Sequence, residues 1–140
     1  MKFLKVIGLV IAVVVLAVGA FYARALWCTR EVALPGQYIA EGAWGTSTLD
    51  LRQDHTFRQK VSFKNQFNEK PEGSKEASGQ WSDEGRSSLS RRFQLSSFVN
   101  LSPSAEQSVV QNYEAEYKTL GTSFGIEVDP GARIYYWKMK

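Results

Sequence analysis

The side chains that could take part in nucleophilic catalysis are few in this sequence of 140 residues. His55 is the only histidine, and Asp50 and Asp54 lie close to it in the chain. A Ser-His-Asp triad would have to use this histidine, because the base of such a triad is an imidazole. His55 lies, however, in a polar stretch that is typical of a turn, where a solvated side chain is the simpler interpretation. We therefore predict a structural role for His55.

Acid–base, metal and nucleotide chemistry also lack the residues that they need. Two pairs of neighbouring carboxylates could serve as acid and base in a glycosidase-like cleft, although neighbouring acids are more often plain solvated groups: Asp83 with Glu84, and Glu114 with Glu116. One His, one Cys and two Met cannot supply a nitrogen- or sulfur-rich metal site. The sequence contains no calcium-loop motif and no glycine-rich phosphate-binding motif. We predict that the protein is not an enzyme, with no cofactor and no catalytic or metal-binding residues.

The only cysteine, Cys28, follows an apolar N-terminal segment. A single cysteine excludes an intrachain disulfide and a CxxC redox pair. A lipoprotein signal requires a small residue directly before the cysteine, and this position holds the bulky Trp27. We interpret Cys28 as an unpaired thiol near a membrane surface. Lipidation and an intermolecular disulfide in an oxidising compartment are the alternatives.

The basic balance of the chain, 17 Lys and Arg against 14 Asp and Glu, comes from its N-terminal segment. Lys2, Lys5 and Arg24 lie in the first 27 residues, which contain no acidic residue. Residues 28–140 therefore carry equal numbers of acidic and basic side chains. Proteins that bind nucleic acid usually carry a basic surface, so we predict no nucleic-acid partner.

The N-terminal segment is long and apolar enough to cross a membrane as a helix. Residues 6–21 contain no charged side chain, and an extension to Trp27 is long enough for the hydrocarbon core of about 30 Å. Tyr22 and Trp27 are aromatic residues of the kind found at membrane interfaces, and Arg24 can reach the interface with its long side chain. With Lys2 and Lys5 in the cytoplasm, the remaining chain would lie outside it.

Two interpretations of this segment remain open. Ala23 and Ala25 flank Arg24 in the arrangement of a signal-peptidase site, which would make residues 1–27 a cleaved signal peptide. The apolar run is longer than the usual signal core of about 7–15 residues, which favours an uncleaved signal anchor. We predict a single transmembrane helix over residues 1–27, a linker over 28–35, and an extracytoplasmic domain over 36–140.

The domain that follows shows the alternation of β-strands. Leu49 and Leu51 alternate with polar residues, and after the polar stretch of residues 53–55 the apolar residues Phe57, Val61 and Phe63 alternate again. Two alternating segments around a polar turn predict a hairpin with one buried face. We expect this hairpin over residues 47–65.

The remaining sequence predicts further short strands and little helix. We expect a loop at 66–76, a strand at 77–83, a turn at 84–90, and strands near 92–101, 124–128 and 133–138. For residues 102–120 a helix is favoured, because Ser102 and Pro103 resemble a helix start and the next apolar residues have roughly helical spacing. A loop with a strand is the alternative. We predict a mainly β fold: a small antiparallel barrel or sandwich of about seven strands with one short helix.

Several short motifs resemble those of bacterial lipocalin-like domains of the cell envelope. They are Gly36-Gln37-Tyr38, the segment Leu49-x-Leu51-x-x-Asp54-x-Thr56-Phe57, Gly79-x-Trp81, and the closing turn Asp129-Pro130-Gly131. The resemblance covers about two thirds of the chain and implies an up-and-down meander and an envelope location. It implies no active site, because these are motifs of hairpins. His55 stands where the pattern usually has Gly, which implies a different turn type.

Two surface features are candidate contacts for a partner. Arg58, Lys60 and Lys64 share the polar face of one expected strand. Arg91 and Arg92 begin another strand, and if the two strands were neighbours their cations would form a basic patch for an acidic partner or for anionic lipid. The simpler interpretation is an ordinary charged exterior, balanced by nearby acids.

The last strand carries the second feature. In the run Tyr135-Tyr136-Trp137, aromatic residues point to both faces, so some must lie outside. Exposed Tyr135 and Trp137 beside Met139 would form a protein-binding edge or a membrane-facing stripe. Because the strand is the last one, we also expect it to be a sheet edge open to pairing with another strand.

The sequence thus predicts a binding role at a membrane. We expect a single-pass protein of the bacterial inner membrane whose domain, on the periplasmic side, is an accessory subunit of a larger membrane protein complex. Partners are the lipid bilayer and a protein. The candidate contact residues are Tyr135, Trp137, Arg58, Lys60 and Lys64. An immunity or inhibitor protein against a toxin, and a lipocalin-like carrier of an apolar ligand, are the alternatives.

Overall fold

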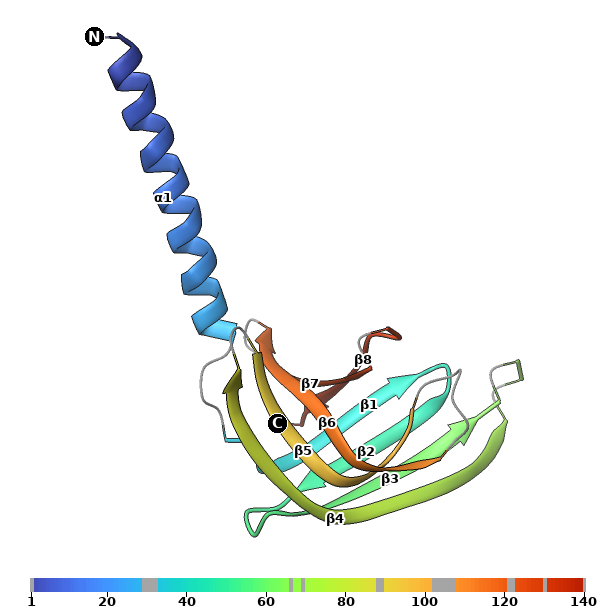
Figure 1. The fold of residues 1–140 in the computed structure, drawn as a ribbon. Coiled ribbons are helices and arrows are strands. Elements are labelled where there is room, and N and C mark those ends of the chain that lie inside the picture. The colour runs from blue at the N-terminus through green and yellow to red at the C-terminus, as the bar shows by residue number, and fades with distance from the viewer. Residues whose placement is uncertain are drawn as a thin grey trace.

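The computed structural model describes residues 2–28, 33–65, 67–68, 70–87, 90–101, 108–120, 123–129 and 131–139. In these residues one long helix, α1 (Lys2–Cys28), precedes eight strands. The strands are β1 (Gly36–Gly42), β2 (Gly45–Leu51), β3 (Thr56–Lys64), β4 (Pro71–Ser87), β5 (Ser90–Val99), β6 (Val109–Leu120), β7 (Ser123–Asp129) and β8 (Ile134–Lys138). Figure 1 shows α1 standing away from the strands, which curve around one another. The chain is mainly β, as its sequence predicts.

The helix α1 is apolar on every side. Its segment Ile7–Trp27 is long and apolar enough to cross a membrane, and none of it is buried in the protein. Large apolar side chains such as Leu9 and Leu16 are more than half exposed. A helix that is apolar all round is stable where its surroundings are also apolar. α1 is therefore compatible with a membrane anchor or with a signal sequence.

The eight strands form a closed antiparallel barrel in which each strand pairs with the next. The barrel closes between the last strand and the first, where Tyr38 lies opposite Lys138 and Ile39 lies opposite Trp137. The expectation that the last strand is a free sheet edge is therefore wrong. β8 has β7 on one side and β1 on the other, because closure removes the edges of a sheet.

The predicted hairpin over residues 47–65 is confirmed. β2 and β3 pair along their whole length, from Gly45 opposite Phe63 to Leu51 opposite Phe57. Along β3, buried and exposed side chains alternate, with Phe57 and Val61 inside the barrel. The period of two in the sequence is thus the alternation between the lumen and the outer face.

β4 is much longer than the sequence indicates. It begins at Pro71, inside the expected loop at 66–76, and runs for 17 residues through the expected turn at 84–90 to Ser87. Residues 71–76 are exposed on both faces of the strand. A strand without a buried face leaves no alternating apolar pattern, so its composition resembles that of a loop.

The helix favoured for residues 102–120 is wrong over its second half. Residues 109–120 form the strand β6, and residues 102–107 lie outside the described residues. Tyr113 and Tyr117 are four residues apart, a spacing that places them on one face of a helix or of a strand. Ala115, buried between them, shows that the period is two.

Large side chains point into the lumen of the barrel. Its fully buried residues include Tyr38, Tyr117, Tyr136, Phe93, Phe98, Leu49, Leu95 and Ile126. A polar chain crosses this apolar interior: the Tyr136 hydroxyl lies 2.5 Å from Ser47 Oγ and accepts a bond of 3.0 Å from Gln59 Nε2. In the described part of the chain, every buried side-chain nitrogen or oxygen has a hydrogen-bond partner.

Candidate functional site

The turn between β2 and β3 is held from the side by Trp81 of β4. The Trp81 backbone N donates to His55 O at 2.8 Å, and its indole Nε1 donates to Arg52 O at 3.0 Å. The His55 ring lies 4.6 Å from the indole ring, between centroids. Asp54 closes the turn by accepting from Thr56 N at 3.0 Å and from Thr56 Oγ1 at 2.6 Å. These contacts fix the backbone that carries Arg52 and Asp54.

His55 adopts the left-handed conformation that usually favours glycine. Its φ angle is 63°, so this turn has the backbone shape that a glycine would give it. The imidazole contacts the Trp81 indole with the ring planes tilted by 34°, and this contact offsets part of the backbone strain.

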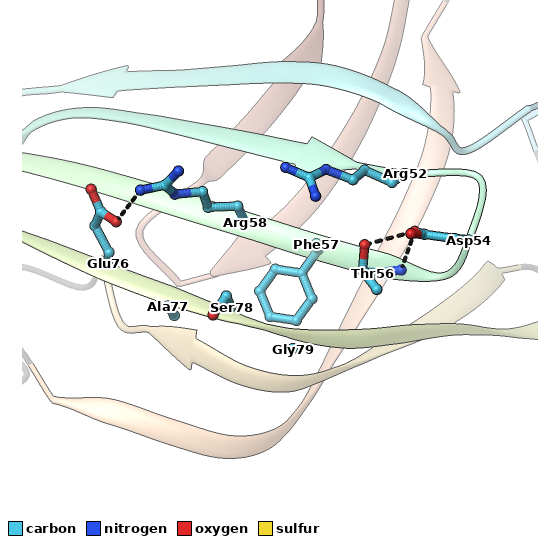
Figure 2. Close-up of a pocket in the computed structure, with 9 residues that line it drawn as sticks. All are labelled: Arg52, Asp54, Thr56, Phe57, Arg58, Glu76, Ala77, Ser78 and Gly79. Atoms are coloured by element: carbon cyan, nitrogen blue, oxygen red, sulfur yellow. Dashed lines mark hydrogen bonds and ion pairs between the residues drawn. The ribbon is translucent and has the colours of Figure 1, made fainter.

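Beside this turn, an open groove of about 580 Å³ lies on the outer face of β3 and β4. Figure 2 shows the guanidinium groups of Arg52 and Arg58 in the middle of the groove, with Asp54 at one end and Glu76 at the other. The groove is lined by Arg52, Asp54, Thr56, Phe57, Arg58, Glu76, Ala77, Ser78 and Gly79.

The charged side chains of the groove have polar partners within the protein. Arg58 Nη2 donates to Glu76 Oε2 at 2.7 Å, and Arg52 Nε lies 3.4 Å from Asp50 Oδ2. The bond from Arg58 lowers the pKa of Glu76, and the bonds from Thr56 lower the pKa of Asp54. Both carboxylates are therefore ionised at neutral pH. The two guanidinium groups remain more than half exposed, at 57% for Arg52 and 60% for Arg58.

This arrangement is suited to binding. Arginine presents a planar fork of donors that matches a carboxylate, and two exposed guanidinium groups can share one anionic group between them. Two carboxylates that are ionised and already bonded are poor proton donors. The groove can therefore hold a polar segment whose carboxylate would lie beside Arg52 and Arg58.

The structure places Arg58, Lys60 and Lys64 on one face, as the alternation predicts. All three side chains are exposed on the outside of β3. Directly opposite them on the neighbouring strands lie Asp50, which faces Arg58, and Glu76, which faces Lys60. Acidic residues thus balance part of this basic face. Only Arg58 of the three lines the groove.

The larger basic patch that Arg91 and Arg92 would complete does not form. β4 separates β5 from β3, and Arg91 points into the barrel, where it donates to the Tyr117 hydroxyl. Its Nη2 lies 3.4 Å from Asp83 Oδ2, and the side chain is 10% exposed. Arg91 therefore closes one end of the lumen, and Arg92 lies outside, 3.8 Å from Glu114.

Tyr135 and Trp137 lie on the outer face of β8, far around the barrel from the groove. Their rings are stacked with centroids 5.7 Å apart. The Tyr135 hydroxyl donates to Glu127 Oε1 at 2.8 Å, and Trp137 is 39% exposed. β1 and β2 separate β8 from β3, so these aromatic residues and the basic face of β3 form two surfaces.

The other candidates from the sequence are dispersed. Asp54 accepts a hydrogen bond from Thr56, and Asp50 accepts one from Arg52. Asp83 points inward to Tyr117, whereas neighbouring Glu84 accepts from Ser82 Oγ, so this carboxylate pair is split between two faces. Among the described residues, no three His, Cys, Asp or Glu side chains are grouped as metal ligands would be.

Glu114 and Glu116 share the outer face of β6, and Glu116 lies opposite Glu127 of β7. They line a small depression of about 260 Å³ together with Arg92 and Tyr113. Cross-strand acids of like charge weaken a sheet slightly.

Sequence reasoning missed two residues of the surface. Arg52 contributes one of the two cations of the groove, and Phe67, in the turn between β3 and β4, is 98% exposed. Arg52 carried no signal beyond its place before a turn. Phe67 did carry one, because it is a single large apolar residue within the polar segment 66–76.

Comparison of the chain with protein-family models, with curated proteins and with solved structures found no significant match. The resemblance to lipocalin-like envelope domains is therefore still a prediction.

Proposed function

We propose that this protein is a membrane-anchored binding module that acts without catalysis, as an accessory subunit of a larger membrane protein complex. In this proposal α1 stays in the bacterial inner membrane and the barrel lies on its periplasmic side. Anchoring raises the effective concentration of the barrel near other membrane proteins, so a weak contact is sufficient.

The observation that carries the proposal is the groove with Arg52 and Arg58. Large buried side chains point into the lumen of the barrel, so the outer surface is the part that a protein partner can reach. Within that surface, two exposed guanidinium groups lie on a backbone that Trp81 holds in place. We propose that the partner inserts a segment with a carboxylate side chain, which would share these cations with Glu76 and Asp54.

Affinity purification of the full chain from gently solubilised membranes tests this proposal. We expect a specific membrane protein to co-purify with the wild-type chain and to be lost with Arg58→Glu, because the new carboxylate would repel both Glu76 and the partner. The mass of the purified chain reports at the same time whether the N-terminal segment is cleaved and whether Cys28 carries a lipid.

Arg133→Glu is the matched control. Arg133 is an exposed arginine in the turn between β7 and β8, so its replacement changes the charge equally without touching the groove. If Arg58→Glu retained the partner while its thermal melt matched that of the wild type, the groove would not be the contact.

An immunity or inhibitor protein against an incoming toxin is the second candidate, and Phe67 is the observation that favours it. This side chain is almost fully exposed in the turn between β3 and β4. An exposed aromatic residue in a turn is suited to meet a protein that arrives from solution. Co-purification of a secreted protein that is lost with Phe67→Ser would favour this alternative over the accessory subunit.

A carrier of an apolar ligand is less well supported. A ligand site of this type usually has a volume of about 300–1,000 Å³ inside the barrel. Here Gln59 and Tyr136 bridge the lumen, and large aromatic side chains occupy the space around them.

A further inference from the structure

The outer face of β8 carries an aromatic pair that is held firmly and is still exposed. The Trp137 ring lies against Gly125 of β7, so that a Cβ atom on this glycine would come within 3.1 Å of the ring. Tyr135 stacks with the Trp137 ring and is fixed by its bond to Glu127. Trp137 nevertheless remains 39% exposed, and Met139, just after the strand, is 52% exposed.

This apolar strand end lies beside the segment through which the chain enters the barrel. Met139 N donates to Gln37 O at 2.8 Å, and Lys138 Nζ donates to Ala33 O. Leu34 is 3% exposed, and its carbonyl accepts a bond from the Tyr38 hydroxyl. Residues 33 and 34 are therefore part of the barrel, although the sequence analysis assigned them to a linker.

The covalent chain limits how far the barrel can lie from the end of α1. From Cys28, where α1 ends, to Ala33 the chain spans at most about 18 Å. Figure 1 shows the C-terminal residues in the half of the barrel that α1 approaches. Trp137 and Met139 are thus within reach of the membrane surface if α1 crosses the bilayer.

We infer that Trp137 and Met139 insert into the headgroup region of the bilayer that α1 spans, so that the β8 side of the barrel rests on the membrane. Tryptophan prefers this region, because its ring is apolar and its N–H can bond to polar headgroups. The inference rests on the proposed function in one respect, the retention of α1 as an anchor.

A functional consequence follows from the order of the strands. β3 and β4 lie on the other side of the closed barrel from β8. Contact of β8 with the membrane would therefore turn the groove with Arg52 and Arg58 away from the lipid and towards protein partners. The aromatic pair would orient the binding surface.

Quenching of tryptophan fluorescence by lipids brominated near the headgroup tests this inference on the full chain in liposomes. The chain has four tryptophans, and Trp44 and Trp81 are buried at 6% exposure each. In Trp27→Phe, Trp137 is the only tryptophan left outside the core. We expect this variant to lose about one third of its emission in brominated liposomes, the share of one indole among three. Trp27→Phe with Trp137→Phe should lose none.

The outcomes separate this inference from the proposed anchor. If the wild-type chain were quenched but Trp27→Phe were not, α1 would be in the bilayer and Trp137 would not, and the inference would be wrong. If the wild-type chain were not quenched either, the anchor would fail and the inference with it. Trp137→Phe keeps an aromatic ring over Gly125, and a thermal melt of each variant confirms that the barrel is folded.

Discussion

The side-chain amide of Gln59 bonds to both backbone groups of Val99. Its Nε2 donates to Val99 O at 3.1 Å, and Val99 N donates to its Oε1 at 2.7 Å. The two residues belong to β3 and β5, which are not neighbours in the barrel. A primary amide presents one donor and one acceptor side by side, so here the side chain takes the place of a paired strand.

The Gln59 side chain replaces backbone pairing at the point where β4 and β5 are no longer paired. Backbone pairing of these strands extends to Trp81 opposite Leu95, while the earlier part of β4 pairs with β3. Beyond that point side chains join the strands: Gln80 N donates to Ser96 Oγ at 2.9 Å, and Ser97 Oγ donates to Ser78 O at 3.0 Å. Gln59 satisfies the next backbone groups from inside the lumen.

Replacement of Gln59 by leucine is expected to destabilise the barrel strongly. Leucine has a similar volume but leaves Val99 N and Val99 O buried without partners, and each unsatisfied group costs about 1–3 kcal/mol. We expect the free energy of unfolding to fall by about 2–5 kcal/mol in urea titrations. Hydrogen exchange at the Val99 amide should become faster. Gln80→Leu, the same change at an exposed position, is the control, and equal stability of the two variants would contradict this account.

Tyr136→Phe is expected to have a smaller effect. The Tyr136 hydroxyl bonds to Ser47 and Gln59, but both keep another partner without it: Ser47 Oγ lies 3.3 Å from Lys60 O, and Gln59 remains bonded to Val99. We expect a loss of about 1 kcal/mol, typical of a single hydrogen bond, in the same urea titration. A loss as large as that of Gln59→Leu would mean that the hydroxyl organises the whole network.

The parts of the fold that the sequence predicts are those with one buried face. β2 and β3 alternate visibly because Leu49, Leu51, Phe57 and Val61 face a packed lumen. Residues 71–76 of β4 have no buried face, so their strand character depends on pairing with β3, which no local pattern reveals. Barrel closure could not be predicted from a local pattern either, because it depends on pairing between β1 and β8, which are distant in the sequence.

The candidate site also has one part that the sequence predicts and another that it does not. The shared face of Arg58, Lys60 and Lys64 follows from the period of two and is predictable. The groove requires Arg52, which is brought beside Arg58 by a turn that Trp81 holds, about 30 residues further along the chain. The sequence predicts Arg91 as part of an outer basic patch, whereas a buried arginine needs partners, which here are Asp83 and Tyr117.

At His55 we expect a glycine variant to be more stable than an alanine variant, which reverses the usual order of stability. At a φ of 63°, a residue with a Cβ atom is strained by about 1 kcal/mol relative to glycine. His55→Ala keeps this strain and loses the ring contact with Trp81, whereas His55→Gly loses the same contact but relieves the strain. We therefore expect His55→Gly to be more stable than His55→Ala by about 1 kcal/mol in thermal or urea unfolding. Equal stability, or a more stable alanine variant, would mean that the turn relaxes to another conformation.

The buried tyrosines should make the barrel sensitive to alkaline pH. Burial, with a contribution from Asp129, raises the pKa of Tyr113 to about 12, and burial also raises the pKa of Tyr38 and of Tyr136. In the unfolded chain these hydroxyls ionise near pH 10. Between these values the folded barrel keeps protons that the unfolded chain releases, so the stability that is fully present below about pH 10 declines as the pH rises towards 12.

Urea titrations at a series of pH values from 9 upwards, with tyrosinate absorbance followed in parallel, measure this decline. Tyr113→Phe should flatten it, because phenylalanine has no proton to lose and Tyr113 is one of the groups whose pKa differs between the two states. The variant also removes the bond from the Tyr113 hydroxyl to Val128 O, so its stability at neutral pH should be lower while its pH dependence is weaker. A wild-type barrel whose stability did not change between pH 10 and 12 would show that these hydroxyls ionise without unfolding the chain. They would then have to lie closer to water than the burial of Tyr38 and Tyr136 and the packing of Tyr113 on Phe98 imply.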